Sequence, residues 1–94
     1  MKTYNKIIEK DNYKFNVKIE LDTRLERGLE GKRFSTVILN EMGLTNFYKK
    51  WEVRNTELID FIDNTIPFEI TYFLNEKKQN PLEKELIKMG FEKD

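Results

Sequence analysis

The segment NYKFNVKIEL, residues 12–21, decides the fold because apolar and polar side chains alternate along its length. The apolar residues occupy every second position: Tyr13, Phe15, Val17, Ile19 and Leu21. A period of two is typical of a β-strand that turns one face to the core and the other to solvent. The segment is therefore predicted to be a half-buried strand.

Asp11 and Asn12 precede this strand and tolerate the positive φ angles that a two-residue hairpin turn requires. A turn at this point predicts an antiparallel strand before it. The register would pair Lys10 with Tyr13, and then Glu9 with Lys14, Ile8 with Phe15, Lys6 with Val17 and Tyr4 with Ile19. This pairing sets apolar side chains opposite apolar ones and joins opposite charges, and both effects stabilise a hairpin.

Two further segments predict strands, and a third allows two interpretations. NFYKKWEV, residues 46–53, reads as a strand after a glycine-containing turn, and TIPFEITYFLN, residues 65–75, alternates again, with Pro67 at the start of a strand or on an edge. RFSTVILN, residues 33–40, is short and rich in β-branched residues, which favours a strand. A helix over residues 34–42 that ends at Gly43 remains the alternative.

Two segments predict helices, and residues 22–33 predict a loop that could include one helical turn. In NTELIDFIDN, residues 55–64, Thr56 is the expected N-cap, and the apolar side consists of Leu58, Ile59, Phe61 and Ile62. QNPLEKELIKMGF, residues 79–91, has Asn80 as the cap, Pro81 in the first position and Gly90 as the stop. Its apolar stripe contains Leu82, Leu86 and Met89.

Length and composition define the fold class. The chain has 94 residues, of which 38% are apolar and 36% charged. A chain of this size forms one domain, buries roughly 60–65% of its unfolded surface and leaves little room for a deep cleft. The sequence predicts a single α+β domain over residues 1–94, with an antiparallel sheet built on the N-terminal hairpin and two or three short helices.

The chain contains neither cysteine nor histidine, and its formal net charge is zero. Disulfides cannot support the fold, no apolar run approaches the roughly 18 residues of a membrane span, and the first residues lack the apolar core of a signal peptide. We expect a cytoplasmic protein without membrane contacts. Phe, Tyr, Met, Ile, Asn and Lys make up 45 of the 94 residues and alanine is absent, which indicates an AT-rich genome.

The residue types exclude most catalytic chemistry. Without histidine and cysteine, the usual general base, thiolate nucleophile and most transition-metal ligands are missing, and no phosphate-binding glycine motif occurs. Glu57, Asp60 and Asp63 follow one another at three-residue steps and could offer oxygen ligands to Mg²⁺. Three acids on a short exposed helix are more often a solvated face. We expect no enzymatic activity, no metal and no cofactor.

The stretch NFYKKWEVRN, residues 46–55, concentrates aromatic and basic residues. In a strand, Phe47, Lys49, Trp51 and Val53 share the core face, whereas Tyr48, Lys50, Glu52 and Arg54 share the outer face. Trp, Tyr and Arg are the residues most often found at the centre of protein interfaces. The candidate protein-binding residues are therefore Tyr48, Lys50, Trp51 and Arg54, and the position of Trp51, in the core or on the surface, stays open.

Charge along the chain is uneven. Residues 32–54 carry five basic and two acidic groups, and residues 55–76 carry five acidic groups and no basic one. We expect the two segments to lie side by side and to neutralise each other. The basic, aromatic segment 32–54 also supports an alternative function, a nucleic-acid-binding regulator in which aromatic rings stack on bases. The zero net charge and the adjoining acidic segment argue against it.

In general character this small, AT-biased, cysteine-free chain resembles the small accessory proteins of phages and mobile elements, many of which bind and inhibit or redirect a host protein. The leading hypothesis is a non-enzymatic module whose partner is another protein. Nucleic-acid binding is the second hypothesis, and a homo-oligomer is compatible with both.

Overall fold

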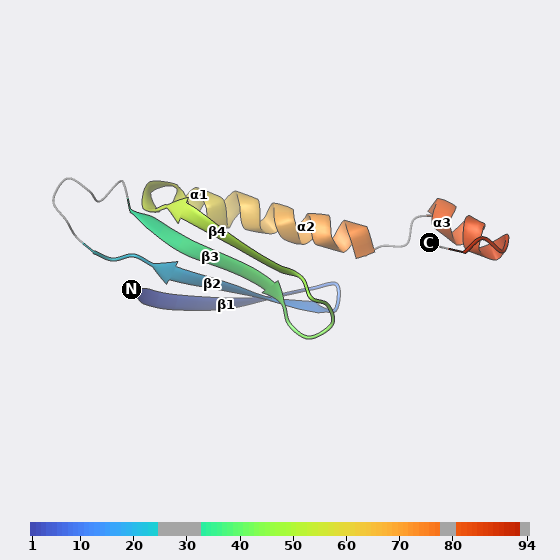
Figure 1. Ribbon diagram of the computed structural model, residues 1–94, viewed down its shortest axis with the longest axis horizontal. Coiled ribbons are helices and arrows are strands. Elements are labelled where there is room, and N and C mark those ends of the chain that lie inside the picture. The colour runs from blue at the N-terminus through green and yellow to red at the C-terminus, as the bar shows by residue number, and fades with distance from the viewer. Residues whose placement is uncertain (25–32, 78–80, 93–94) are drawn as a thin grey trace.

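The computed structural model describes residues 1–24, 33–77 and 81–92. Four strands form one antiparallel sheet in which each strand pairs with the next along the chain (Figure 1). They are β1 (Lys2–Lys10), β2 (Tyr13–Leu21), β3 (Phe34–Glu41) and β4 (Tyr48–Arg54). The α+β class and the antiparallel sheet predicted from the sequence are thereby confirmed.

The N-terminal hairpin has the predicted turn and the predicted register. Asp11 and Asn12 have φ angles of 51° and 68°, as a two-residue turn between right-twisted strands requires. Each predicted pair is present, including Ile8 with Phe15 and Glu9 with Lys14. The local sequence is sufficient here because the turn fixes the register and the register matches apolar with apolar residues.

Residues 34–41 form a strand, so the helical alternative for residues 34–42 is wrong. A tight connection leads from β3 to β4, with Gly43 at a φ angle of 110°. The buried Glu41 carboxylate accepts the backbone N–H of Leu44 at 2.9 Å. The backbone N–H of Glu41 donates to the carbonyl of Phe47 at 3.1 Å, which closes the connection into β4.

One continuous helical stretch follows β4. It consists of a 3₁₀ turn η2 (Asn55–Glu57), α1 (Leu58–Asp60), a wider π-helical turn η3 (Phe61–Thr65) and α2 (Ile66–Lys77). We refer to residues 55–77 as the main helix. The predicted strand over residues 65–75 is therefore wrong. Pro67 lies in the first turn of α2, directly after η3. A π-helical turn such as η3 interrupts the regular backbone hydrogen bonds of a helix.

The burial of α2 explains why it is a helix. Its buried residues are spaced for one helical face: Ile66, Ile70, Phe73 and Leu74. Phe68 and Tyr72, which an alternating strand would have placed in the core, are 65% and 54% exposed. The alternation in this segment is thus incidental, and the helical spacing determines the contacts with the sheet.

The helices differ from the sequence prediction in number and in detail. One main helix replaces the two or three short helices that we expected, and the short helix α3 (Pro81–Lys88) follows it. No side chain caps the start of the main helix. Thr56 lies within its first turn, so the prediction that Thr56 is the N-cap is wrong. Ile59, assigned to the apolar side, is 68% exposed because it points away from the sheet.

α3 is the helix predicted between Asn80 and Gly90. Gly90 ends it with a φ angle of 93°. The backbone N–H of Phe91 donates to the carbonyl of Leu86 at 3.0 Å, and that of Gly90 donates to the carbonyl of Ile87 at 3.1 Å. These two bonds form the Schellman motif of a glycine-terminated helix. Asn80, the predicted cap, lies outside the described residues.

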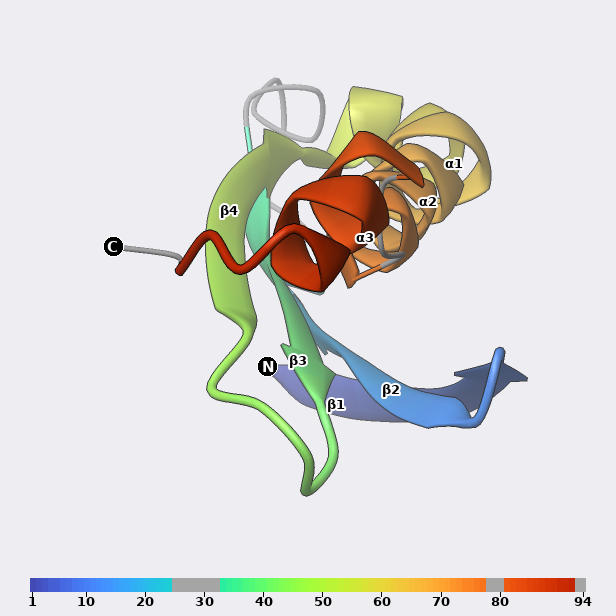
Figure 2. The same cartoon turned by 90° about the vertical axis from the view of Figure 1, so that its right-hand side faces the viewer.

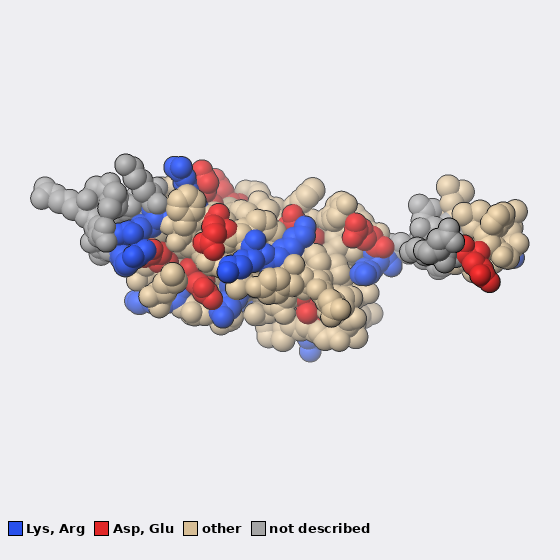
Figure 3. Space-filling view, in the orientation of Figure 1, with Lys and Arg blue, Asp and Glu red and all other residues tan. Residues whose placement is uncertain are grey.

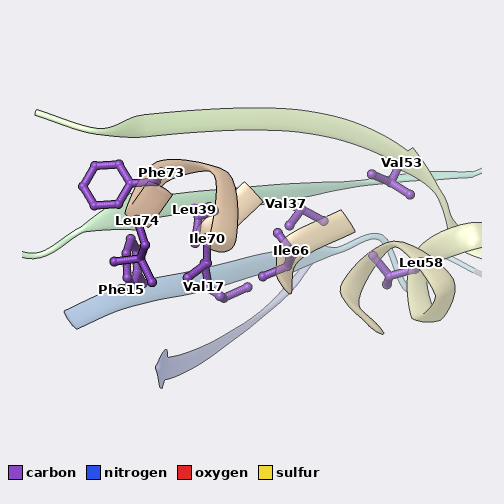
Figure 4. Packing of buried hydrophobic residues seen from close by; sticks show 10 residues of the cluster. All are labelled: Phe15, Val17, Val37, Leu39, Val53, Leu58, Ile66, Ile70, Phe73 and Leu74. Carbon is purple, nitrogen blue, oxygen red and sulfur yellow. The ribbon is translucent and has the colours of Figure 1, made fainter. Parts of the chain in front are cut away.

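The core lies between one face of the sheet and the main helix. The sheet curls so that β1 and β4 stand at a wide angle, and the main helix lies in the hollow between them (Figure 2). The buried side chains come from β2, β3, β4 and the main helix (Figure 4): Phe15, Val17, Val37, Leu39, Val53, Leu58, Ile66, Ile70, Phe73 and Leu74. Phe15 and Phe73 meet edge to face, with ring centroids 5.4 Å apart. No helix among the residues that the structure describes covers the other face of the sheet.

Candidate functional site

The face of the sheet turned away from the main helix is the candidate functional site, and we refer to it as the open face. Figure 2 shows the main helix on the opposite side. Strand alternation places every second side chain on the open face. The cross-strand register assembles these side chains into rows that run across the sheet.

The rows differ in charge. They follow one another along the strands as Phe34 and Arg54; then Glu20, Thr36 and Glu52; then Lys18, Ile38 and Lys50; then Asn16, Asn40 and Tyr48. Successive rows lie about 6.5–7 Å apart, since residues i and i+2 of a strand are separated by two rises. The open face thus presents a basic-aromatic row, an acidic row, a basic row and an amide row in sequence.

The charged rows are held by contacts within the sheet. The hydroxyl of Thr36 donates to the carboxylate of Glu52 at 2.9 Å. Lys18 and Glu20 form an ion pair at 3.5 Å along β2. The Arg54 guanidinium lies over the Phe34 ring, 5.6 Å from its centroid. These contacts restrict the side chains and reduce the entropy that they would lose on meeting a partner.

Three of the four residues proposed as a binding site lie on the open face. Tyr48, Lys50 and Arg54 are exposed and point away from the core, as the alternation in β4 predicted. Trp51 lies on the other side of the sheet. It is half-buried against Phe61 of the main helix, with ring centroids 5.2 Å apart. The structure therefore separates Trp51 from the other three residues.

The basic and acidic segments predicted to be neighbours do meet. Lys49, on the core side of β4, forms an ion pair with Glu69 of α2 at 2.7 Å. The contact attaches α2 to the edge strand β4. Figure 3 shows a short band of Lys and Arg side chains over β4 with acidic side chains on either side of it.

Sequence reasoning missed the open-face residues outside residues 46–55. Lys18 and Ile38 lie in the row of Lys50, Asn16 and Asn40 lie in that of Tyr48, and Phe34 contacts Arg54. A signal was present, because the even positions of residues 14–20 are polar throughout and Phe34 begins the β-branched run. Only the pairing of the strands shows that these residues adjoin β4.

A buried polar network lies where the sheet meets the start of the main helix. Asn55 donates through its amide to the carbonyl of Asp22 at 2.9 Å and accepts the hydroxyl of Ser35. The Asp22 carboxylate, only 4% exposed, receives the Arg24 guanidinium at 2.6 Å. Hydrogen bonds from the side chain and the backbone of Arg24 hold the pKa of Asp22 well below its usual range. Each of these polar groups has a structural role, so the network is not a candidate active site.

The acidic residues of the main helix form no metal site. Glu57, Asp60 and Asp63 are exposed. Among the described residues, no group of three or more carboxylate, histidine or cysteine side chains is arranged to hold a metal ion. Within the same part of the chain, no helix has the length and apolar character needed to cross a membrane.

The chain matches no known protein family, no curated protein and no solved structure.

Proposed function

We propose that the protein is a non-enzymatic binding module that contacts another protein through the open face of its sheet. One observation carries the proposal: Tyr48, Lys50 and Arg54 lie together on the sheet face that the main helix leaves uncovered. Tyr and Arg are enriched at the centres of protein interfaces because they combine apolar area with directed polar groups. A rigid sheet presents such groups without ordering a loop.

The arrangement of charge favours a protein partner over a nucleic acid. Glu20 and Glu52 form an acidic row between Arg54 and the Lys18–Lys50 row. A phosphate backbone following the strands would cross this row and be repelled by it. A protein surface can present opposite charges row by row, and such complementarity gives specificity without any net charge.

The wider setting is proposed from composition. The AT-biased, cysteine-free and histidine-free sequence is in keeping with a cytoplasmic accessory protein of a phage or mobile element, and inhibition of a host protein is the corresponding activity. Nucleic-acid binding through segment 32–54 is the competing function.

Affinity capture from a lysate, with and without nuclease, separates the two functions. A protein partner should remain bound after nuclease treatment and at moderate salt. A nucleic-acid complex should be lost on nuclease treatment, and its affinity should fall steeply with salt concentration because counterions are released on binding. Loss of all captured material with nuclease would reject the proposal.

Variants then test the surface with the captured partner. Tyr48→Ala combined with Arg54→Ala should weaken binding at least about tenfold, roughly 1.4 kcal/mol, in a titration such as calorimetry. The melting temperature should change little, because both residues are exposed. Tyr72→Ala with Lys77→Ala is the control, since it likewise removes one tyrosine and one basic residue, here from the exposed surface of α2.

Trp51→Ala completes the test. We expect it to lower the free energy of unfolding by several kcal/mol, because Trp51 packs between the sheet and Phe61. A stable Trp51→Ala protein that no longer binds would move the contact surface to the helix side of β4. Unchanged binding in the Tyr48, Arg54 double variant would remove the open face from the functional surface.

A further inference from the structure

A groove separates the edge strand β1 from the main helix. It has a volume of about 280 Å³. Its floor is apolar and consists of Ile8, Val17, Ile19, Ile62 and Ile66. Lys6 of β1 and Asp63 of the main helix, both exposed, stand on its two walls. The volume lies just below the range of small-molecule sites, about 300–1,000 Å³, and the floor offers few polar groups to orient such a ligand.

α3 carries the apolar surface that such a groove would take. Leu86, Met89 and Phe91 are 47%, 69% and 59% exposed. A helix of eight residues is too short to persist in water by itself, since isolated helices need about 12–15 residues. The Schellman motif at Gly90 fixes where the helix ends, but it does not cover the apolar side chains. α3 therefore has the character of a segment that packs against another surface.

The two features are complementary in apolar character and in charge. Leu82, Leu86 and Met89 are spaced four and three residues apart, the pattern with which an amphipathic helix enters an apolar groove. Glu85 and Lys88 are exposed beside this stripe and form an i,i+3 pair. Glu85 and Lys88 thus carry charges opposite to those of Lys6 and Asp63 on the groove walls.

The chain geometry places this contact between two copies. Residues 62–67, which line the groove, precede the end of α2 at Lys77 by 10–15 residues, or about 15–22 Å of helix. α3 is only about 12 Å long. Folded back along its own α2, it would bring little more than its last residues to the groove. Figure 1 shows α3 beyond the end of α2 and away from the sheet.

We infer that the protein forms a symmetric dimer in which α3 of each copy packs into the groove between β1 and the main helix of the other copy. A two-fold axis makes both contacts at once from the same pair of surfaces. Two such contacts, each with several large apolar side chains, bury on the order of 1,000 Å², the size at which specific interfaces begin. The dimer leaves the open face accessible, and the inference of a dimer does not depend on the function proposed for the open face.

Sedimentation equilibrium from micromolar to several hundred micromolar protein tests the dimer. The full chain should reach twice its monomer mass of 11.4 kDa as its concentration rises. Met89→Glu, on α3, and Pro67→Glu, on the exposed wall of the groove, should each raise the dimer dissociation constant at least tenfold. Circular dichroism confirms that each variant is folded, and Ile8→Lys is the second groove variant if Pro67→Glu unfolds. Phe68→Glu changes an exposed apolar residue outside the groove and should leave the dimer unchanged.

Mixing the two variants tests whether α3 of one copy packs into the groove of the other copy. Met89→Glu retains an intact groove and Pro67→Glu retains an intact α3, so an equimolar mixture can restore one of the two contacts. The mixture should contain more dimer than either variant alone at the same total concentration. A monomer at every concentration, a dimer that Phe68→Glu dissociates and Pro67→Glu does not, or a mixture no more dimeric than its components would overturn the inference.

Discussion

Residues 13–21 and residues 66–74 both place large apolar side chains at every second position, yet the first is strand β2 and the second lies in helix α2. The difference lies in the positions between. In β2 these are Lys14, Asn16, Lys18 and Glu20, all polar. Wound into a helix, β2 would scatter its apolar residues over two opposite faces. In residues 66–74 the intervening position 73 is a phenylalanine, and it completes a helical face with Ile66, Ile70 and Leu74.

The surroundings of the two segments also differ. A two-residue turn directly before β2 places β1 beside it as an antiparallel partner in register. The segment 66–74 has no such turn, and it follows the helical residues 55–65 without interruption. Helix propagation adds one hydrogen bond per residue once a first turn exists. An alternating pattern therefore specifies a strand only where the intervening residues are polar and a partner strand is near in sequence.

The largest expected effect is at Phe15, where β2 meets the main helix. Phe15 is fully buried and contacts Phe73 and Phe47. Phe15→Ala should lower the free energy of unfolding by about 3–5 kcal/mol, measured by urea denaturation. Ile7→Ala, on the exposed face of β1, is the control and should cost far less. A cost near zero for Phe15→Ala would mean that the faces of β2 are reversed.

The two phenylalanines of α2 distinguish the observed helix from the strand that the sequence predicted for this segment. Phe73→Ala should cost about 3–4 kcal/mol, because Phe73 is buried against Phe15 and Tyr13. Phe68→Ala should cost less than about 0.5 kcal/mol, because Phe68 is exposed. A strand would reverse this order, since positions 68 and 73 lie on opposite faces of a strand. Thermal and urea unfolding of the two variants therefore decide between the helix and the strand.

A smaller effect is expected from the Asp22 carboxylate, which lies just after β2 and binds Arg24. The pKa of Asp22 is lowered in the folded state by Arg24, so the ionised form stabilises the fold. This contribution is present above the unfolded pKa, about 4, and is lost as the pH falls below it. The melting temperature of the protein should therefore fall more steeply between pH 4 and pH 2 than that of Asp22→Asn. Parallel acid titrations of the two would contradict the assignment.

The smallest effect concerns the turn that gives β2 its partner. Asn12 has a φ angle of 68°, which a β-branched residue adopts at a cost of roughly 1–2 kcal/mol. Asn12→Val should reduce stability by about that amount, as measured by chemical denaturation. Asn12→Gly should be neutral or slightly stabilising, because glycine accepts positive φ without strain. Equal stability of the two variants would show that the turn does not control the register.

Much of the candidate site could be anticipated from the sequence, but its extent could not. The alternation in β4 predicted that Tyr48, Lys50 and Arg54 share a face and that Val53 faces the core, and both are confirmed. The contributions of Lys18, Ile38 and Phe34 depend on which strands are neighbours and in what register. Ile38 and Lys50, 12 positions apart, and Lys18 and Ile38, 20 positions apart, become adjacent there, and no local pattern encodes such distances.

The sequence by itself determined the features that depend on a few neighbouring residues. The Asp11–Asn12 turn and the alternation after it specified the hairpin, and Pro81 with Gly90 specified the bounds of α3. Local backbone preferences decide these features because each needs only one turn or one cap. The tertiary structure alone decided that residues 66–77 are a helix, that Trp51 packs against Phe61, and that one face of the sheet stays open. Those outcomes depend on which apolar surface is available for burial, and the folded sheet creates that surface.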